Sequence, residues 1–447
     1  MATNHARFPF LALQLAGALA LLGASSGAQA QLRLPGGLPS GLPGIGLPAA
    51  RLDDADRVLR QLQRDLPDVR ELRQSLSARL LRQHPDVLEA DPRGFPAVRH
   101  EILAFDPSPA ALAAAQAAGL RILRRSSLDD GGPATVVLGV PDGVATAAML
   151  DQLRALDADG VYDFNHIYVG SGSGAGVDVT AGAATAPAAR TGGPIKVALV
   201  DSGVDSGHAA FRNAKVERWG CGGELHPDAH GTAVAALMVG QAPPFRGGAP
   251  GAHLYAADIY CGSAAGGSAD RIAAALAWLA GRQVGVINLS LVGPANRSLE
   301  QLVTALVKRG HLLVAAVGND GPAAPPLYPA SYPGVVGVSA VGRSGQPLPE
   351  AARGPQVMFA APGNNMLSAA IGQPAWRAVR GTSFAAPLVA ALLAEQLPAP
   401  DKAKANQAVA ALARQAVRPA GVTVSNETGY GIVGAELRTD PTAFKNF

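Results

Sequence analysis

Strand-like and helix-like stretches alternate throughout the second half of the chain. The strand-like stretches are short and almost wholly apolar, at 195–200, 253–259, 284–289 and 312–317. The helix-like stretches between or after them lie at 231–239, 269–279 and 299–308. This alternation is typical of a mostly parallel sheet with helices on both faces. We therefore predict an α/β domain over 195–447, with its ligands at the carboxyl ends of the strands.

Three polar motifs stand where this pattern predicts strand ends and helix starts. Asp201 ends the first strand in Asp-Ser-Gly, His230 opens a helix in His-Gly-Thr, and Ser383 opens a helix in Gly-Thr-Ser-Phe-Ala-Ala-Pro. A serine nucleophile needs a histidine to accept its proton and a carboxylate to orient the histidine. Each motif alone is equally well explained as a turn or a helix cap. Taken together, the three motifs and their order along the chain favour a catalytic site.

A fourth motif, Gly318-Asn319-Asp-Gly, follows another predicted strand. Asn319 alone is explained by a left-handed turn before Gly321. Beside a serine nucleophile, its side-chain amide can donate to a developing oxyanion together with the backbone N–H of Ser383. We expect these two groups to form an oxyanion hole.

Together, the motifs resemble those of the subtilisin-like serine proteases, the subtilase family, and the resemblance runs over 195–433. The order Asp…His…Ser is that of subtilisin, whereas an esterase of the α/β-hydrolase kind has Ser…Asp…His. The resemblance implies a serine endopeptidase that acts on proteins or peptides through an acyl-enzyme. In it Asp201, His230 and Ser383 are catalytic and no metal or cofactor takes part. A catalytically silent binding or scaffold protein with this fold is the alternative.

The resemblance also assigns a set of residues to substrate binding. They are Ser290, Leu291, Val292 and Gly318. Val292 stands where many relatives have glycine, so we expect its branched side chain either to narrow the first specificity pocket and favour smaller residues, or to reshape the cleft.

The first thirty residues predict a signal peptide, with Arg7, an apolar stretch over 8–23 and Ala-Gln-Ala ending at Ala30. Cleavage after Ala30 would give an exported protein, periplasmic or extracellular, without a membrane span. An uncleaved anchor is the alternative. A Pro- and Gly-rich linker is expected over 31–50, because it lacks periodicity.

Two further segments precede the α/β domain. Apolar residues three and four apart predict helices over 51–92. The next segment, 93–169, has the order β-α-β-β-α-β of a small ferredoxin-like α+β domain. A Gly- and Ser-rich stretch over 170–194 predicts a second linker.

In the subtilase family, a domain of this kind at this position is commonly a propeptide that assists folding and inhibits the enzyme. The resemblance therefore implies a prodomain that acts as an intramolecular inhibitor, and it makes Tyr168–Val169 a candidate self-cleavage site. A tyrosine there fits poorly with a pocket narrowed by Val292. An unrelated interaction domain is the alternative.

The chain has two cysteines, Cys221 and Cys261. In an exported protein such a pair predicts one disulfide, with two free thiols as the alternative. The loop from Gly240 to Gly248 lacks the side-chain oxygens that calcium requires, so no calcium is expected there, and other sites are left open. The net charge of +3 gives no reason to expect a nucleic acid partner. We expect a monomer.

Overall fold

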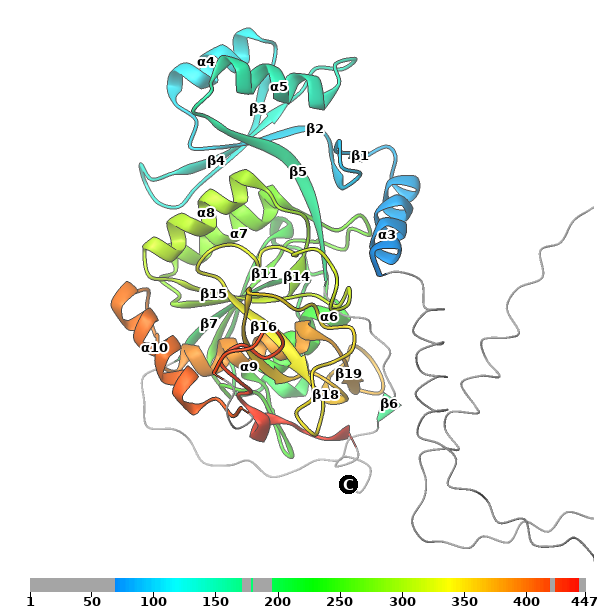
Figure 1. Cartoon of the computed structure of the whole chain (residues 1–447), viewed down its shortest axis with the longest axis vertical. Helices are drawn as coiled ribbons and strands as arrows, with labels where there is room; N and C mark the ends of the chain where they lie inside the picture. The colour runs from blue at the N-terminus through cyan, green and yellow to red at the C-terminus, as the bar shows by residue number, and fades with distance from the viewer. Residues whose placement is uncertain (1–68, 171–177, 180–194, 419–422, 442–447) are drawn as a thin grey trace, which may run out of the picture. The chain divides into compact units, whose positions relative to one another are not determined.

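The computed structural model describes residues 69–170, 178–179, 195–418 and 423–441 (Figure 1). The chain divides into two units, 1–66 and 67–447, and the first lies wholly outside the described residues. The predicted signal peptide with Ala30, the linker over 31–50 and the start of the helical segment therefore lie there too. None of the described helices has the length and apolar character needed to cross a bilayer.

The second half of the chain is built on a parallel sheet of seven strands. In spatial order these are β17 (Val357–Pro362), β16 (Val336–Val341), β15 (Leu312–Ala316), β13 (Val286–Leu289), β7 (Lys196–Asp201), β11 (His253–Asp258) and β8 (Val216–Trp219). The predicted α/β class with a mostly parallel sheet is confirmed.

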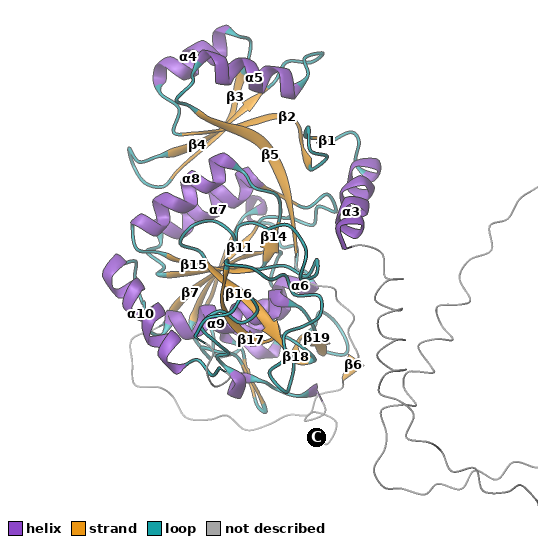
Figure 2. Cartoon of the chain, in the orientation of Figure 1, coloured by secondary structure: helices purple, strands orange, loops and turns teal. Residues whose placement is uncertain are grey.

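Helices cover both faces of this sheet (Figure 2). On one face lie α6 (Ala229–Val239), α9 (Thr382–Ala394) and α10 (Lys402–Gln415). On the other lie α7 (Ala269–Gly281) and α8 (Arg297–Lys308). In β7, Val197 and Leu199 join the first apolar core, whereas Ala198 and Val200 join the second. Burial on both faces explains why this strand is an unbroken apolar run.

The segment before the second linker forms an antiparallel sheet of its own. Its elements are β2 (Pro96–Phe105), α4 (Pro109–Ala117), β3 (Arg121–Ser127), β4 (Ala134–Gly139), α5 (Thr146–Leu156) and β5 (Val161–Gly170). The strand order β5-β2-β4-β3 and the two helices on one face give a ferredoxin-like arrangement (Figure 1). Helix α3 (Val69–Gln83) and strand β1 (Leu88–Ala90) precede it, and β1 pairs with β2.

Short strands complete the fold. They are β12 (Gly267–Ser268), β14 (Leu291–Val292), the hairpin of β9 (Gln241–Ala242) and β10 (Phe245–Arg246), and the small sheet of β18 (Met366–Ala369), β19 (Trp376–Val379) and β6 (Asp178–Val179). Three 3₁₀ turns lie at Ala209–Phe211, Cys221–Gly223 and Ala435–Leu437. Both β12 and β14 pair with the end of β5, so this strand passes out of its own sheet into the second domain.

Candidate active site

Asp201 and His230 form a hydrogen-bonded pair at the carboxyl edge of the parallel sheet. Asp201 is the last residue of β7 and is 1% exposed. His230 lies in the first turn of α6, and its Nδ1–H donates to Asp201 Oδ1 at 2.8 Å. Burial alone would lower the pKa of His230, but the Asp201 carboxylate reverses this and holds the pKa above its ordinary value. The other ring nitrogen, Nε2, is buried and has no hydrogen bond within the described residues.

The first turn of α6 packs directly against the end of β7. A side chain on Gly231 would put its Cβ 2.2 Å from the Ser202 carbonyl oxygen, so only glycine fits there. The N–H of Gly231 donates to Ser202 Oγ at 3.0 Å, and Asp228 caps the helix through the N–H of His230 at 2.8 Å. These contacts explain the Asp-Ser-Gly and His-Gly-Thr motifs, because they set the imidazole beside the carboxylate.

Ser383 lies in the first turn of α9 and is fully buried. The φ of +130° at Gly381 allows the sharp entry into this helix. The next residue, Phe384, places its ring 5.3 Å from the imidazole of His230, so the serine and histidine helices meet at the same edge of the sheet. Ser290 contacts the serine twice, since its Oγ donates to the Ser383 carbonyl at 2.9 Å and its own carbonyl accepts from Ser383 Oγ at 3.4 Å.

Asn319 follows β15 and faces the start of α9. Its Oδ1 accepts the N–H of Thr382 at 3.0 Å, which fixes the orientation of the side-chain amide. Gly318, one residue before, donates its N–H to Thr382 Oγ1 at 3.2 Å. The amide group of Asn319 is therefore held next to the residue that precedes Ser383.

The residues expected from the sequence to bind substrate lie close to the start of α9, since Ser290 contacts Ser383 and Gly318 contacts Thr382. Leu291 and Val292 make up β14, and both are buried. A Cβ on Gly318 would lie 3.6 Å from Cγ1 of Val292, so this side chain lies next to Gly318. Narrowing of the first pocket by Val292 stays a prediction.

The end of β5 runs as an added antiparallel strand in the groove between β12 and β14. Val169 and Gly170 pair with Val292 and Leu291 of β14. On its other side, β5 pairs with β12 through Ile167 and Tyr168. Gly170 reaches His230, since a Cβ on it would lie 3.5 Å from Cε1 of the imidazole. An extended chain between two edge strands is how peptides are bound by strand addition.

The position of Tyr168 bears on the predicted cleavage site. Its ring lies against Gly293 and its hydroxyl donates to the Pro294 carbonyl at 2.9 Å, so the side chain is wholly buried away from His230. Gly170, two residues later, is the residue beside the histidine. The Tyr168–Val169 bond therefore precedes the residue that lies beside His230. The sequence suggested this bond because, in the subtilase resemblance, the stretch ending at Tyr168 would lie in the active site as a cleavage product does.

Polar residues of β5 cap two helices of the parallel-sheet domain. Asp163 Oδ2 accepts the N–H of Arg297 in α8 at 2.7 Å, and Asn165 Oδ1 accepts the N–H of Asp270 in α7 at 3.0 Å. These bonds satisfy donors that a helix start leaves unpaired. These caps were not predicted from the sequence. The available indication was a set of polar residues, Asp163, Asn165 and His166, in a strand with many apolar residues.

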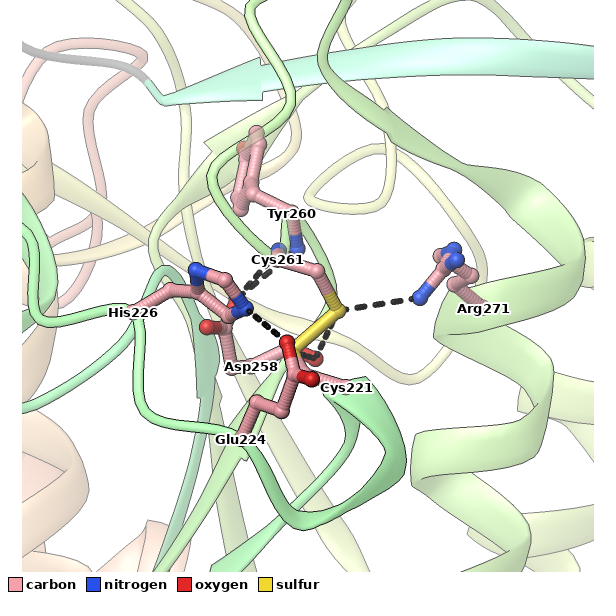
Figure 3. Close-up of a disulfide and its surroundings, with 7 residues drawn as sticks. All are labelled: Cys221, Glu224, His226, Asp258, Tyr260, Cys261 and Arg271. Carbon is pink, nitrogen blue, oxygen red and sulfur yellow. Dashed lines mark hydrogen bonds and ion pairs between the residues drawn. A yellow bond between two sulfur atoms is a disulfide. The ribbon is translucent and has the colours of Figure 1, made fainter.

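Cys221 and Cys261 are joined in a disulfide, with their Cα atoms 5.2 Å apart (Figure 3). The bond links the turn after β8 to the loop after β11. Asp258 orders that loop by accepting the N–H groups of Tyr260 and Cys261, both at 2.9 Å. Asp258 also places a carboxylate near the two sulfur atoms, but sulfurs bonded to each other are not thiolate ligands for a metal. The disulfide therefore ties together the two loops that follow β8 and β11.

The sequence profile of the Subtilase family matches residues 192–431, more than half of the chain, and the chain belongs to this family. It is 33% identical over 210 residues to subtilisin E of Bacillus subtilis (strain 168), and the match covers 45% of this chain and 54% of that protein. It is 34% identical over 219 residues to subtilisin Savinase of Lederbergia lenta, covering 46% of this chain and 78% of that protein. The chain thus spans about half the length of subtilisin E.

Fervidolysin from Fervidobacterium pennivorans, a keratinolytic enzyme related to subtilisin, has a similar solved structure. The TM-score is 0.62 at 20% sequence identity, with 76% of this chain and 61% of that chain covered. At this identity the similarity shows a shared fold.

Proposed function

We propose that this chain is an exported serine endopeptidase, made as a zymogen that cleaves itself. The observation that supports it most strongly is the Asp201–His230 hydrogen bond at the sheet edge where Ser383 opens α9. A scaffold protein would have no need of a buried carboxylate that orients a histidine toward a serine helix. Family membership agrees with this chemistry.

In the proposed reaction, Ser383 Oγ attacks the carbonyl carbon of a peptide bond, and His230 Nε2 takes the hydroxyl proton. Asp201 stabilises the imidazolium that forms. Asn319 and the N–H of Ser383 donate to the oxyanion, which gains most from donors that are already in place. His230 then protonates the leaving amine, and water hydrolyses the acyl-enzyme. No metal or cofactor is needed, and extended peptides are the substrates.

The position of β5 supports a self-inhibited precursor. Its last residues occupy the groove as a bound peptide would, and Asp163 and Asn165 anchor it on two helices of the peptidase domain. The domain over 93–169 then acts as an intramolecular inhibitor. Since Gly170 is the residue beside His230, we place the self-cleavage C-terminal to it, in the linker that joins the two domains.

Export is supported by the signal-peptide pattern and by the disulfide, because disulfides persist in oxidising compartments. The similar protein named minor extracellular protease Epr of Bacillus subtilis (strain 168) agrees with this. Cleavage after Ala30, release without a membrane span and a monomeric mature enzyme complete the proposal.

A fluorophosphonate probe tests the proposed chemistry, since it reacts with activated serines. We expect labelling of the processed protein, none of the Ser383→Ala variant, and hydrolysis of casein by the former alone. A folded, processed protein that is not labelled at Ser383 would favour the silent scaffold instead.

A further inference from the structure

Helix α3 lies outside the ferredoxin-like domain, yet one of its side chains reaches the active-site region. The Arg73 guanidinium makes a two-point ion pair with Asp320, with Nη2 donating to Oδ1 at 2.9 Å and Nε donating to Oδ2. Asp320 is the residue directly after Asn319. The two side chains are 19% and 18% exposed, so solvent screens this ion pair less than it screens a pair on the open surface. Bidentate arginine–carboxylate pairs are among the stronger polar contacts in proteins.

The apolar side of the same helix faces the strand that fills the groove. Leu80 belongs to one apolar cluster with Leu88 of β1, Ile167 of β5 and Ala265, and Val169 packs at the margin of the cluster. Ala265 stands just before β12, the strand that pairs with one side of β5. Figure 1 shows α3 next to β1, and the two are in contact.

The helix thus has two anchors on the second domain. The apolar anchor is at Ala265, beside β12, and the charged anchor is at Asp320, beside the oxyanion residue. Residues 167–170 of β5 pair with the strands β12 and β14 that line the groove. For this strand to leave, its pairing with both strands must break, and the contacts of α3 oppose that movement.

We propose that α3 is a strap that holds β5 in the substrate groove, so that the inhibitory unit begins at the helix and not at the ferredoxin-like domain. This inference rests on the proposed function, because it concerns release of the same site. Charge reversal at Arg73 removes the strap's charged anchor without altering β5 or the catalytic residues.

The first experiment needs no catalysis. In the full chain carrying Ser383→Ala, hydrogen–deuterium exchange is compared between Arg73→Glu and Arg79→Glu. Arg79 lies on the same helix and is exposed, so its reversal is a matched control for charge. We expect about three- to tenfold faster exchange over 167–170 and along α3 in the Arg73→Glu variant alone, with β3 and β4 unchanged. Adding Asp320→Arg to Arg73→Glu should slow the exchange again.

Equal exchange in the two single variants would overturn the strap, and so would a failure of the double variant to restore protection. The second experiment follows casein hydrolysis by the full chain with Ser383 intact. We expect Arg73→Glu to shorten the lag before activity about three- to tenfold relative to Arg79→Glu. Equal lags with an active wild type would overturn the strap and leave the proposed function standing. An inactive wild type would overturn the proposed function, while the exchange data would still decide whether α3 holds β5.

Discussion

Nδ1 of His230 lies 2.8 Å from Oδ1 of Asp201, and the carboxylate is almost completely buried at the end of a central strand. The same Oδ1 accepts the N–H and the hydroxyl of Ser202 at 2.7 and 3.1 Å. The carboxylate is thus held in place from its own strand end. It can orient the imidazole without being drawn away from it.

Replacing Asp201 by Asn should reduce kcat about 10³- to 10⁴-fold, because the amide no longer favours the tautomer that leaves Nε2 free to accept a proton. Hydrolysis of a chromogenic peptide by the processed variant measures the effect. Circular dichroism of wild type and variant is the control for folding. A loss of less than tenfold would mean that Asp201 does not orient the base.

The pH dependence follows from the raised pKa of His230. The general base must be neutral, so kcat/KM should fall as pH drops, with a midpoint above 6.5, the ordinary value for histidine. The contribution of this pair to the stability of the fold changes with pH in the opposite direction to kcat/KM. Because the folded-state pKa is raised, the stabilisation is full below the unfolded pKa and is lost as pH rises through the folded pKa.

Two measurements check these signs. One is a pH–rate profile of the processed enzyme, and the other compares urea unfolding of wild type with the Asp201→Asn variant at several pH values. An acid limb with its midpoint clearly below 6.5 would contradict the predicted direction.

Replacing Val292 by Gly should widen the pocket next to Gly318. We expect kcat/KM to rise about tenfold for peptides with Phe before the cleaved bond, and to change little for peptides with Ala there. The ratio of the two rates is the measurement, so that a change in enzyme concentration cancels. An unchanged ratio would show that Val292 does not line the first pocket.

N-terminal sequencing of the mature protein locates the processing site. Because Gly170 lies beside His230, the mature chain should begin C-terminal to it, and Ser383→Ala should remain unprocessed in a protease-deficient host. A mature chain beginning at Val169 would contradict the register of β5 against β14. Processing of the Ser383→Ala variant at the same bond would show that another protease acts there.

Much of the catalytic domain could be predicted from local patterns. An apolar run such as 196–200 has to be buried on both faces, and motifs such as His-Gly-Thr occur where a helix start must approach a strand end. Because these motifs together match one family, Asp201, His230 and Ser383 could be predicted together as a catalytic set. The predicted element order of the ferredoxin-like segment also agrees with the strands and helices that the structure has there.

Contacts between segments that are distant in the chain could not be predicted in this way. The sequence predicted a cleaved bond after Tyr168. In the structure, β5 pairs with β14 so that Gly170, two residues later, lies beside His230. Asp163 and Asn165 are helix caps only because α8 and α7 begin next to them. Arg73 looked like one of many surface arginines until the fold placed Asp320 within reach.

Periodicity and motif geometry are properties of neighbouring residues, so the α/β class, the order of the motifs and the chemistry they support could be predicted without the fold. The fold was needed to show which residue of β5 lies beside His230 and that Arg73 of α3 pairs with Asp320. Register and ion pairing depend on which distant segments meet, and in a strand a shift of one residue turns every side chain to the opposite face.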